Sequence, residues 1–391
     1  MTHRPFHAIC RRLRDNVRAG QPDRCDSVMQ VPAMNYRDPV QWARELDAIF
    51  LEVPLLVALS CDLPERGDFR TFVIAGRALL IVRGDDGRVR TFINACRHRG
   101  ARVAGDAQGH ARRFTCPYHA WSYDLQGRLD GVAGRESFGD IPADGLQQLP
   151  TEERLGAVFA VLRPDAVLDL DGWLAHGMGD SLRALELDAL YAHRATSVLE
   201  TPNWKLAADG YLDGYHIGYL HRDSIGAKAI TNRNTYDLLG PHARIGFANK
   251  RIEEIDALPE AQWQLPDYMS LVHYVFPNVS ISGGIGDTLM LSRLFPGPTV
   301  DRSITVQHQY FRQPIEGDLL RIADEKLRTY ERVVRDEDAA TIFGIGESLP
   351  GMGAQPILFG RNEPANQHLH RTIAAMTHSH AKLGHGAPTG N

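Results

Sequence analysis

Two short stretches decide the fold of this chain, Asn94-Ala-Cys-Arg-His-Arg-Gly100 and Cys116-Pro-Tyr-His-Ala-Trp121. Each holds one cysteine and one histidine at close spacing, as Cys-x-His in the first and Cys-x-x-His in the second. Together they offer two thiolates and two imidazoles. Unrelated residues would seldom form two mixed pairs at such short spacings, so we interpret the four side chains as one ligand set.

Two kinds of metal centre take two cysteines and two histidines. A zinc site binds them in a tetrahedron, but zinc fingers usually place Cys with Cys and His with His. Mixed pairs, in which each loop gives one ligand to each iron, favour a Rieske [2Fe–2S] cluster, which carries electrons. We therefore predict a Rieske cluster, with a zinc module as the alternative, on the ligands Cys96, His98, Cys116 and His119.

Composition narrows the class of protein. The 391 residues are 43% hydrophobic and 23% charged, as in ordinary globular proteins, and leave room for two or three domains. A net charge of −5 argues against a nucleic-acid partner. The apolar run near residues 53–59 is far shorter than the roughly 20 residues of a membrane span, and no secretory signal is evident. With five cysteines and no disulfide pattern, we expect a cytoplasmic protein.

Periodicity predicts an α+β chain in four parts. Residues 1–50 are expected to form a helical segment that packs on the second domain, and 51–165 an all-β domain. Residues 166–379 mix helices with an antiparallel sheet, and 380–391 are expected to be a flexible tail. The predicted strands are Thr71–Ile74, Ala78–Val82 and Val89–Ile93 in the first domain, and Leu271–Ser282, Thr288–Phe295 and Ser303–Phe311 in the second.

A second group of metal-binding residues lies in Asp213-Gly-Tyr-His-Ile-Gly-Tyr-Leu-His221. His216 and His221 are about 140° apart around an ideal helix, so they can share a face only if the helix widens or breaks. Gly214 and Gly218 make such a distortion cheap. Two histidines need a carboxylate to complete a facial triad for Fe(II), with positions left open for dioxygen.

Helical periodicity points to the third ligand. We predict a long helix over Asp318–Phe343, in which Asp338 falls on the apolar stripe, Asp336 on the opposite face and Glu337 at the margin. A carboxylate in an apolar stripe needs a partner, because burying an unpaired charge is expensive. A metal ion suits the companion histidine pair, and an arginine is the alternative. The stripe contains Leu320, Ala323, Leu327, Tyr330, Val334 and Ile342.

Both groups closely resemble the motifs of Rieske non-haem iron oxygenases, the large (alpha) subunits of aromatic ring-hydroxylating dioxygenases. The similarity covers roughly residues 36–375. One departure is Gly210, where many members have an asparagine three residues before the bridging acid. Beyond the two Cys/His stretches, the likeness is carried by Asn203-Trp-Lys-Leu, the Asp213–His221 segment, Glu337-Asp338, and Gly360-Arg-Asn-Glu363 through His368-Leu-His370.

The resemblance implies a fold and a set of site residues. The fold is an all-β Rieske domain followed by a catalytic domain of the helix-grip type. Each chain would bind one [2Fe–2S] cluster and one mononuclear Fe(II), the latter through His216, His221 and Asp338. Asp213 would relay electrons from His119 of one subunit to the catalytic histidine of its neighbour. The alternative is that Asp213 merely caps or salt-bridges a helix.

The resemblance also implies an activity. The chain would be the terminal oxygenase that activates dioxygen and hydroxylates or dihydroxylates an aromatic or related small organic substrate. Oxidative demethylation or quaternary-amine monooxygenation is the first alternative, and a non-enzymatic Rieske electron carrier the second. The substrate is left open. Candidate pocket residues, which could equally be core, are Tyr211, Phe247, Tyr274, Phe276 and Met290.

Such an oxygenase depends on partners. The chain has no G-x-G-x-x-G fingerprint after a predicted strand and no P-loop, so a nicotinamide or flavin domain is not expected within it. Electrons would come from an external NAD(P)H-dependent reductase, a ferredoxin, or both. A relay across a subunit boundary implies a homo-oligomer, expected to be a trimer with or without small subunits.

Overall fold

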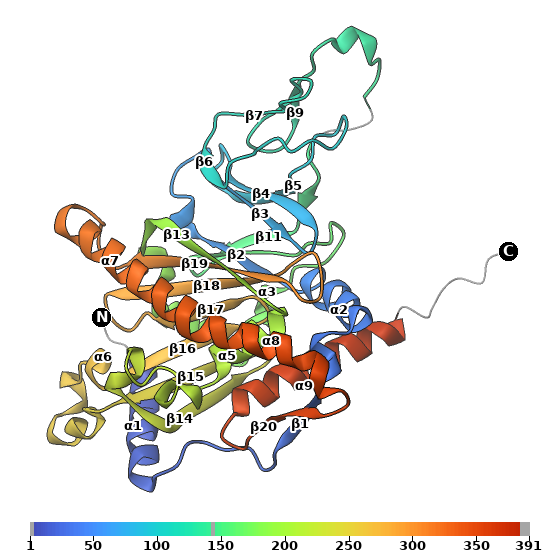
Figure 1. Ribbon diagram of the computed structural model, residues 1–391. Coiled ribbons are helices and arrows are strands. Elements are labelled where there is room, and N and C mark those ends of the chain that lie inside the picture. Colours follow the sequence, from blue (N-terminus) through green and yellow to red (C-terminus); the bar gives the residue numbers. More distant parts are fainter. Residues whose placement is uncertain (1–3, 142–144, 384–391) are drawn as a thin grey trace. The chain divides into compact units, whose positions relative to one another are not determined.

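The structure, a computed structural model, describes residues 4–141 and 145–383, which form two compact units (Figure 1). The division falls at Phe50 and Gly172, where the sequence predicted 51 and 165. The β unit contains Phe50–Gly172 with Leu187–Ala189, and the sheet–helix unit contains the described parts of Met1–Ile49, Trp173–Glu186 and Leu190–Asn391.

The β unit is built from short antiparallel strands. The turn between β3 and β4 has positive φ at both Ala75 (49°) and Gly76 (75°), which matches the right-handed twist of a two-residue hairpin. One sheet has the order β10-β5-β4-β3-β6, a second β11-β12-β2, and a third β7-β8-β9. The strands are β2 (Leu55–Leu59), β3 (Asp68–Ile74), β4 (Arg77–Arg83), β5 (Val89–Ile93), β6 (Gln108–His110), β7 (Phe114–Thr115), β8 (Ser122–Tyr123), β9 (Leu129–Gly131), β10 (Gln148–Leu149), β11 (Thr151–Arg154) and β12 (Ala157–Ala160).

The sheet–helix unit contains a seven-stranded antiparallel sheet in the order β13-β19-β18-β17-β16-β15-β14. The single strand predicted over Leu271–Ser282 was wrong, since two strands of a hairpin lie there. Pro277 separates them, because it has no N–H for a strand ladder. The strands are β13 (Tyr191–Thr201), β14 (Ala229–Leu239), β15 (His242–Asn249), β16 (Met269–Val275), β17 (Val279–Gly283), β18 (Thr288–Pro296) and β19 (Ser303–Phe311), and β1 (Met29–Pro32) pairs separately with β20 (Pro356–Phe359).

Helices complete this unit. Helix α1 buries Phe6, Ile9, Cys10 and Leu13 on one face and contacts β14 and β15. In Figure 1, α7 and α8 follow one another as one long rod in front of the strands. The α-helices are α1 (Arg4–Ala19), α2 (Pro39–Glu45), α3 (Leu170–Trp173), α4 (Met178–Leu185), α5 (Trp204–Leu212), α6 (Leu265–Tyr268), α7 (Gly317–Val333), α8 (Ala340–Met352) and α9 (Pro364–Leu383).

Shorter helical turns join these elements. Two are π-helical, at Leu46–Phe50 and Val334–Ala339, and the second lies between α7 and α8. The 3-10 turns are Ala33–Tyr36, Ser60–Asp62, Arg135–Ser137, Leu187–Ala189, His216–Gly218, Ile225–Lys228, Ile252–Ala257 and Glu260–Gln262.

Three details of the sequence prediction change. The predicted helix over Asp318–Phe343 is α7, the π turn and α8. In its stripe Ala323 and Leu327 are buried and Tyr330, Val334 and Ile342 are half-buried, whereas Leu320 is 44% exposed. The tail predicted over 380–391 is still helical to residue 383, and its remainder lies outside the described residues.

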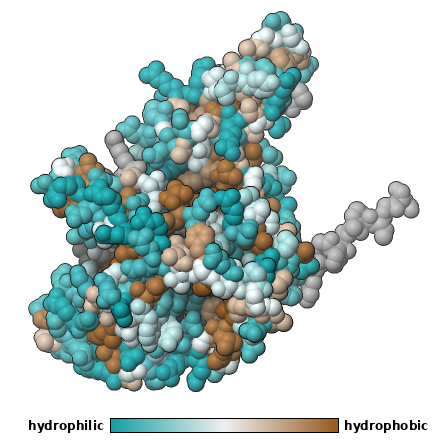
Figure 2. Space-filling model, viewed as in Figure 1, coloured by the Kyte–Doolittle hydropathy of each residue, from teal (hydrophilic) through white to brown (hydrophobic). Residues whose placement is uncertain are grey.

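The surface is of mixed character. The face shown in Figure 2 is largely hydrophilic, and its hydrophobic side chains form scattered patches. Among the helices of the described residues, none is both long enough and apolar enough to cross a bilayer. The α+β prediction, a Rieske-type β domain followed by an antiparallel sheet packed with helices, is confirmed.

Candidate functional site

The two Cys/His loops share one backbone pattern. In the first, Cys96 N–H donates to Ala101 O (2.8 Å) and Gly100 N–H donates to Cys96 O (2.8 Å). In the second, Cys116 N–H donates to the Trp121 carbonyl (2.8 Å), and Ala120 N–H donates back to Cys116 O (3.0 Å). Gly100 and Ala120 both have positive φ, at 76° and 56°. Each loop is therefore a tight turn that holds its cysteine and histidine on the same side.

The four candidate cluster ligands are brought together. Cys96 and Cys116 are free thiols and 3% exposed, and the rings of His98 and His119 lie 4.6 Å apart. The Nδ1 atom of His98 is buried and has no hydrogen-bond partner among the described residues. A buried, unpartnered imidazole nitrogen beside buried thiols suits a metal ligand, so the residues fit a Rieske cluster.

Aromatic residues surround this ligand set. Trp121 stacks on His98 with ring centroids 5.0 Å apart, and Phe138 lies 5.4 Å from His98. The buried Tyr123 hydroxyl accepts from Arg97 N–H (2.9 Å) and lies 3.2 Å from Cys96 Sγ. Since the Arg97 amide is a donor, the phenol proton is free for the sulfur. Sequence analysis did not single out Tyr123, because nothing in the sequence around it signals a contact with sulfur.

The second group of residues follows α5. Asn203 caps the start of this helix by accepting from Lys205 N–H (2.9 Å). Glu45 accepts from Lys205 Nζ (2.6 Å) and Trp204 Nε1 (2.9 Å), and all three side chains are buried. The Asn-Trp-Lys motif therefore fixes where α5 begins, and so where its last turn delivers Asp213.

The C-terminal signature residues also hold α5. Asp209, in this helix, lies within 3.0 Å of His370 Nε2 and accepts from the Tyr36 hydroxyl (2.7 Å). Asn366 Nδ2 donates to the Asp209 carbonyl (2.9 Å). These contacts suggest a structural role for His370, away from the candidate metal ligands.

The helix breaks, as the spacing of His216 and His221 required, but it does so before both histidines. Helix α5 ends at Leu212, and the chain continues as a 3-10 turn over His216–Gly218. His221 Nε2 lies 3.1 Å from Asp338 Oδ1, and His216 Nε2 lies 3.6 Å from the same oxygen. Ligand atoms of the three residues all lie within 4.8 Å of one another. The three candidate iron ligands therefore lie close together in the structure.

Each histidine of this group is backed by a carboxylate. His216 Nδ1 lies 3.1 Å from Asp213 Oδ2, and His221 Nδ1 lies 2.6 Å from Glu337 Oε2. With Nδ1 of each ring against one of these acids, both Nε2 atoms face Asp338. Ligating histidines usually pass their other N–H to a carboxylate in this way. Two imidazoles and one carboxylate, so oriented, fit a facial-triad Fe(II) site.

Glu337 was expected at the margin of the apolar stripe, and its side chain is 28% exposed, but its contact with His221 was not foreseen. The prediction assumed 3.6 residues per turn, but Val334–Ala339 is a π turn, which widens the helix at this point. Ser224 Oγ also donates to Glu337 (2.8 Å). Asp336 lies away from this group and pairs with Arg335 (2.7 Å).

Charge pairing dominates the electrostatics of the site. Burial alone would lower the pKa of His216, but hydrogen bonds to Asp213 and Asp338 raise it to about 9. The pKa of His221 is raised by Asp338 and Glu337 against the same effect of burial. Burial would raise the pKa of Asp338, but both histidines lower it. A metal ion bound here would therefore displace protons from the two histidines.

A cavity of about 120 Å³ adjoins the three residues. Tyr211 and Phe247 line it, as predicted, whereas Tyr274 and Phe276 belong to the core. Met290 lines an open groove of about 590 Å³ that shares Ile225, Ser282 and Tyr330 with the cavity.

Fold and ligand groups together define a two-centre metalloprotein, with one cluster site and one mononuclear site. The Rieske [2Fe-2S] domain model matches residues 53–149, and the model for the catalytic domain of the ring-hydroxylating alpha subunit matches residues 187–379. The chain belongs to the family of Rieske oxygenase large subunits, and these two domains imply one Rieske cluster and one mononuclear iron.

Curated relatives have different named activities. The chain is 33% identical over 201 residues to the oxygenase subunit of glycine betaine monooxygenase from Chromohalobacter salexigens, covering 50% of this chain and 44% of the relative. It is 35% identical over 192 residues to the alpha subunit of 2-aminobenzenesulfonate 2,3-dioxygenase from Alcaligenes sp, covering 46% and 47%. The chain spans about half the length of the curated relatives it matches.

Solved structures share the fold over nearly the whole chain. The quaternary ammonium Rieske monooxygenase CntA, in complex with an inhibitor, has a TM-score of 0.76 at 21% identity, over 94% of this chain and 98% of that one. Naphthalene 1,2-dioxygenase with indole bound has a TM-score of 0.70 at 17% identity, over 89% and 92%. At these identities the likeness is one of fold.

Proposed function

We propose that this protein is the terminal oxygenase of a Rieske non-haem iron system, which activates dioxygen to hydroxylate or dihydroxylate a small organic substrate. One observation supports this most directly. His216, His221 and Asp338 converge beside a cavity, and each histidine is backed by its own carboxylate. A Rieske electron carrier would need only the β unit, so this second ligand group favours an enzyme over that alternative.

The proposed roles of the site residues follow from their contacts. Cys96, His98, Cys116 and His119 would hold the cluster. Glu337 would orient His221, and Asp213 would orient His216. The bound iron supplies the dioxygen chemistry, while the protein supplies ligands, orientation and exclusion of water. The proposed iron ligands are His216, His221 and Asp338.

Asp213 has contacts that suit a relay between subunits. Its Oδ1 accepts from the backbone N–H of Tyr215 (2.6 Å) and His216 (3.4 Å), so it does cap the turn, as the alternative reading supposed. Its Oδ2 lies beside His216 Nδ1, and the side chain is still 23% exposed. That exposed edge could accept the imidazole N–H of His119 from a neighbouring subunit. A homo-oligomer, which we propose to be a trimer with or without small subunits, would supply it.

The cavity bears on the substrate. Its described lining includes the aromatic residues Tyr211, Phe247 and Tyr330 and contains neither lysine nor arginine. A neutral ring fits such a lining, and so does a quaternary ammonium head, which aromatic faces attract. We therefore keep ring hydroxylation as the main proposal. Quaternary-amine monooxygenation or oxidative demethylation is the second candidate, favoured by the same aromatic lining.

Further partners complete the proposal. Electrons would reach the cluster from an external NAD(P)H-dependent reductase, a ferredoxin, or both, in the cytoplasm. Dioxygen consumption with a matched reductase, measured across neutral arenes, aromatic acids, methoxy compounds and quaternary amines, would assign the substrate class. Aromatic acids are expected to be poor substrates, because the described cavity lining holds neither lysine nor arginine to pair with their carboxylate.

Replacing Asp213 tests the relay directly. The variant Asp213→Ala should keep nearly normal cluster and iron content but stop substrate oxidation. The control is Asp223→Ala, which removes an aspartate that is 87% exposed and pairs only locally with Arg222. Normal turnover by Asp213→Ala would refute the relay. Loss of turnover by Asp223→Ala as well would show that the assay reports general damage.

A further inference from the structure

Strand β14 is irregular along part of its length. It pairs with β15 at Ile230 and again from Thr235, but between these two positions β14 has four residues where β15 has only Phe247. Asn232, inside this stretch, has a φ of 53°, in the left-handed region. We call residues 231–234 the β14 bulge. Bulges are common next to active sites, where they redirect side chains, so we asked what this one contacts.

The turn that follows α5 packs against the β14 bulge at two glycines. A Cβ added to Gly214 would lie 2.7 Å from both Cγ and Oδ1 of Asn234. A Cβ added to Gly218 would lie 2.2 Å from Thr231 Cγ2. Neither glycine has a positive φ, so the backbone conformation alone does not call for glycine. Glycine is needed at both positions because the turn approaches the bulge so closely.

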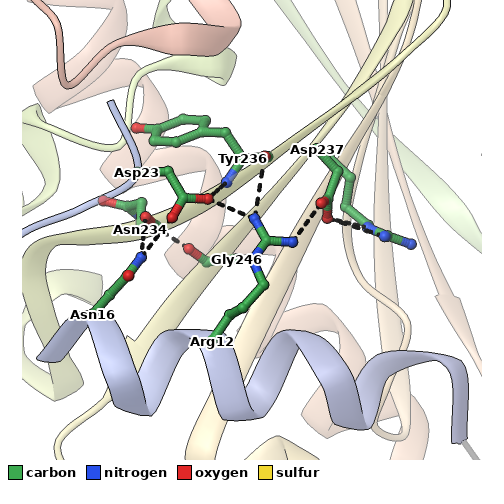
Figure 3. Close-up of polar contacts among 8 residues, drawn as sticks. Arg12, Asn16, Asp23, Asn234, Tyr236, Asp237 and Gly246 are labelled. Carbon is green, nitrogen blue, oxygen red and sulfur yellow. Dashed lines mark hydrogen bonds and ion pairs between the residues drawn. The ribbon is translucent and has the colours of Figure 1, made fainter. Parts of the chain in front are cut away.

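The Asn234 side chain is fixed on the side away from the turn. It is 3% exposed, and its Nδ2 donates to Gly246 O (3.1 Å) on the neighbouring strand β15 (Figure 3). Gly246 in turn lies beneath α1, since a Cβ added there would lie 3.0 Å from Ile9 and 3.2 Å from Leu13. The Asn234 amide therefore cannot rotate away from Gly214 without losing a buried hydrogen bond, which is costly.

The N-terminal arm, residues 4–25, holds the backbone of the bulge. The arm lies outside both matched family models. Asp23 N–H and Asn16 Nδ2 both donate to Asn234 O, each at 3.0 Å (Figure 3). The Asp23 carboxylate accepts from Asn16 Nδ2 (3.0 Å) and from Arg12 (2.5 Å). The arm therefore bonds a backbone group that the edge strand β14 would otherwise leave unpaired.

These contacts form a continuous support from the arm to two site residues. Gly214 lies between Asp213 and His216, whose Oδ2 and Nδ1 atoms are 3.1 Å apart. We infer that Asn234 is a positioning residue for the Asp213–His216 pair, and that the N-terminal arm keeps Asn234 against the turn. This inference rests on the proposed iron-ligand role of His216. Reacting groups are sensitive to small displacements, since about 1 Å of misplacement can cost a factor of roughly 100 in rate.

The variant Asn234→Ala tests the inference. It removes the amide that faces Gly214, together with the hydrogen bond to Gly246. In the holoenzyme, hydrogen–deuterium exchange should become about fivefold faster in a peptide that spans residues 213–218, the effect of losing about one buried hydrogen bond. With nitric oxide as the probe of the ferrous site, the EPR signal should change in rhombicity, while the iron and cluster contents stay close to those of the wild type.

The possible outcomes separate the inference from the proposed function. Exchange over 213–218 at the wild-type rate would overturn the inference. Faster exchange with an unchanged nitric oxide signal would overturn it too, because the amide would then hold the backbone without affecting His216. A wild-type holoenzyme that gives no nitric oxide signal would instead refute the proposed iron site, and the inference with it.

Steric compensation tests the contact itself. Gly214→Ala places a methyl group against the Asn234 amide, so it should also alter the nitric oxide signal. Adding Asn234→Ala removes the amide atoms that this methyl meets, so the double variant should return toward the wild-type signal. A double variant no closer to the wild type than Gly214→Ala would contradict the contact. Gly344→Ala is the control and should change nothing, because a Cβ added there has no neighbour within 4 Å.

Asn249→Ala is the matched control for the loss of an amide. Asn249 lies on β15, and its Nδ2 donates to the carbonyl of Pro266 (3.2 Å) instead of packing against the turn. Exchange over 213–218 and the nitric oxide signal should both match those of the wild type. If Asn249→Ala accelerated that exchange as much as Asn234→Ala, the effect would be a general loss of stability and the inference would fail.

Two variants in α1 test the role of the arm. Asn16→Ala removes a hydrogen bond to the Asn234 carbonyl and should accelerate exchange over 213–218. Arg14→Ala should not, because Arg14 pairs with Asp15 and Asp256 instead of the bulge. Both changes keep a good helix former in α1. Equal exchange rates in the two variants would contradict the role of the arm.

Discussion

Removing the Tyr123 hydroxyl should lower the reduction potential of the cluster. The hydroxyl accepts from Arg97 N–H at 2.9 Å and lies 3.2 Å from Cys96 Sγ, so its own proton is directed to the sulfur. Because Tyr123 is fully buried, bulk solvent does not compete for this hydrogen bond. An O–H donor favours the more negative, reduced cluster, because hydrogen bonds to charged acceptors are the stronger ones.

The size of the effect follows from the energy of one hydrogen bond. A buried bond contributes about 1 kcal/mol net. If all of it favours the reduced state, the one-electron potential falls by roughly 40 mV in Tyr123→Phe, since 59 mV corresponds to a tenfold change in the equilibrium constant. The ring is kept, so the core beside Cys96 should stay packed and the cluster should still assemble.

A redox titration that follows the visible absorbance of the cluster measures this shift. Tyr118→Phe is the control, because Tyr118 is 60% exposed and lies against Arg99 and His119 instead of a sulfur. Its potential should match that of the wild type. A Tyr123→Phe protein with a full cluster and an unchanged potential would show that the hydroxyl does not donate to the ligand sulfur.

Two other predictions concern the cavity and the stability of the sheet–helix unit. In Gly210→Ala, the new methyl would lie 3.5 Å from Ile342 Cδ1, which is an ordinary contact. Because alanine replaces glycine within α5, the free energy of unfolding should rise by about 0.5–1 kcal/mol. Because Gly210 lines the cavity, the KM for bulky substrates should rise as well. A lower free energy of unfolding would contradict this. His242 donates from Nε2 to Trp173 O (2.8 Å) and accepts at Nδ1 from Phe276 N–H (3.1 Å). Burial lowers its pKa from 6.5 to about 4, so the unfolded chain binds a proton that the folded protein refuses between these values. The free energy of unfolding should therefore decrease as the pH is lowered through that window, and this residue should account for about 2 kcal/mol of the decrease between pH 7.5 and pH 5. In urea unfolding, His242→Gln should lack this contribution to the pH dependence. An identical pH dependence in the variant would refute the assignment.

Local chemistry made much of this protein predictable from sequence. The ligands of each Cys/His loop are close in the chain, and strands such as β5 and β19 have the bounds that their patterns predicted. The break after α5 followed from the spacing of His216 and His221, because no regular helix brings positions five apart onto one face.

What the sequence did not reveal depends on irregular backbone and distant contacts. The contact of Glu337 with His221 was not foreseen, because a π turn shifts the helical phase at that point. Tyr274 was a pocket candidate by residue type, but its hydroxyl is used by Pro277 in the core. The close approach of Gly214 to Asn234 in strand β14 joins two segments that share no motif, so only the folded chain shows it.

Metal and sulfide analysis of the purified holoenzyme tests the central claim most directly, that one chain holds both centres. The wild type should contain about three iron atoms and about two acid-labile sulfide ions per chain. Asp338→Ala should lose about one iron and keep its sulfide and red-brown colour. A colourless zinc protein without sulfide would contradict the cluster, and full iron content in Asp338→Ala would exclude that residue as a ligand.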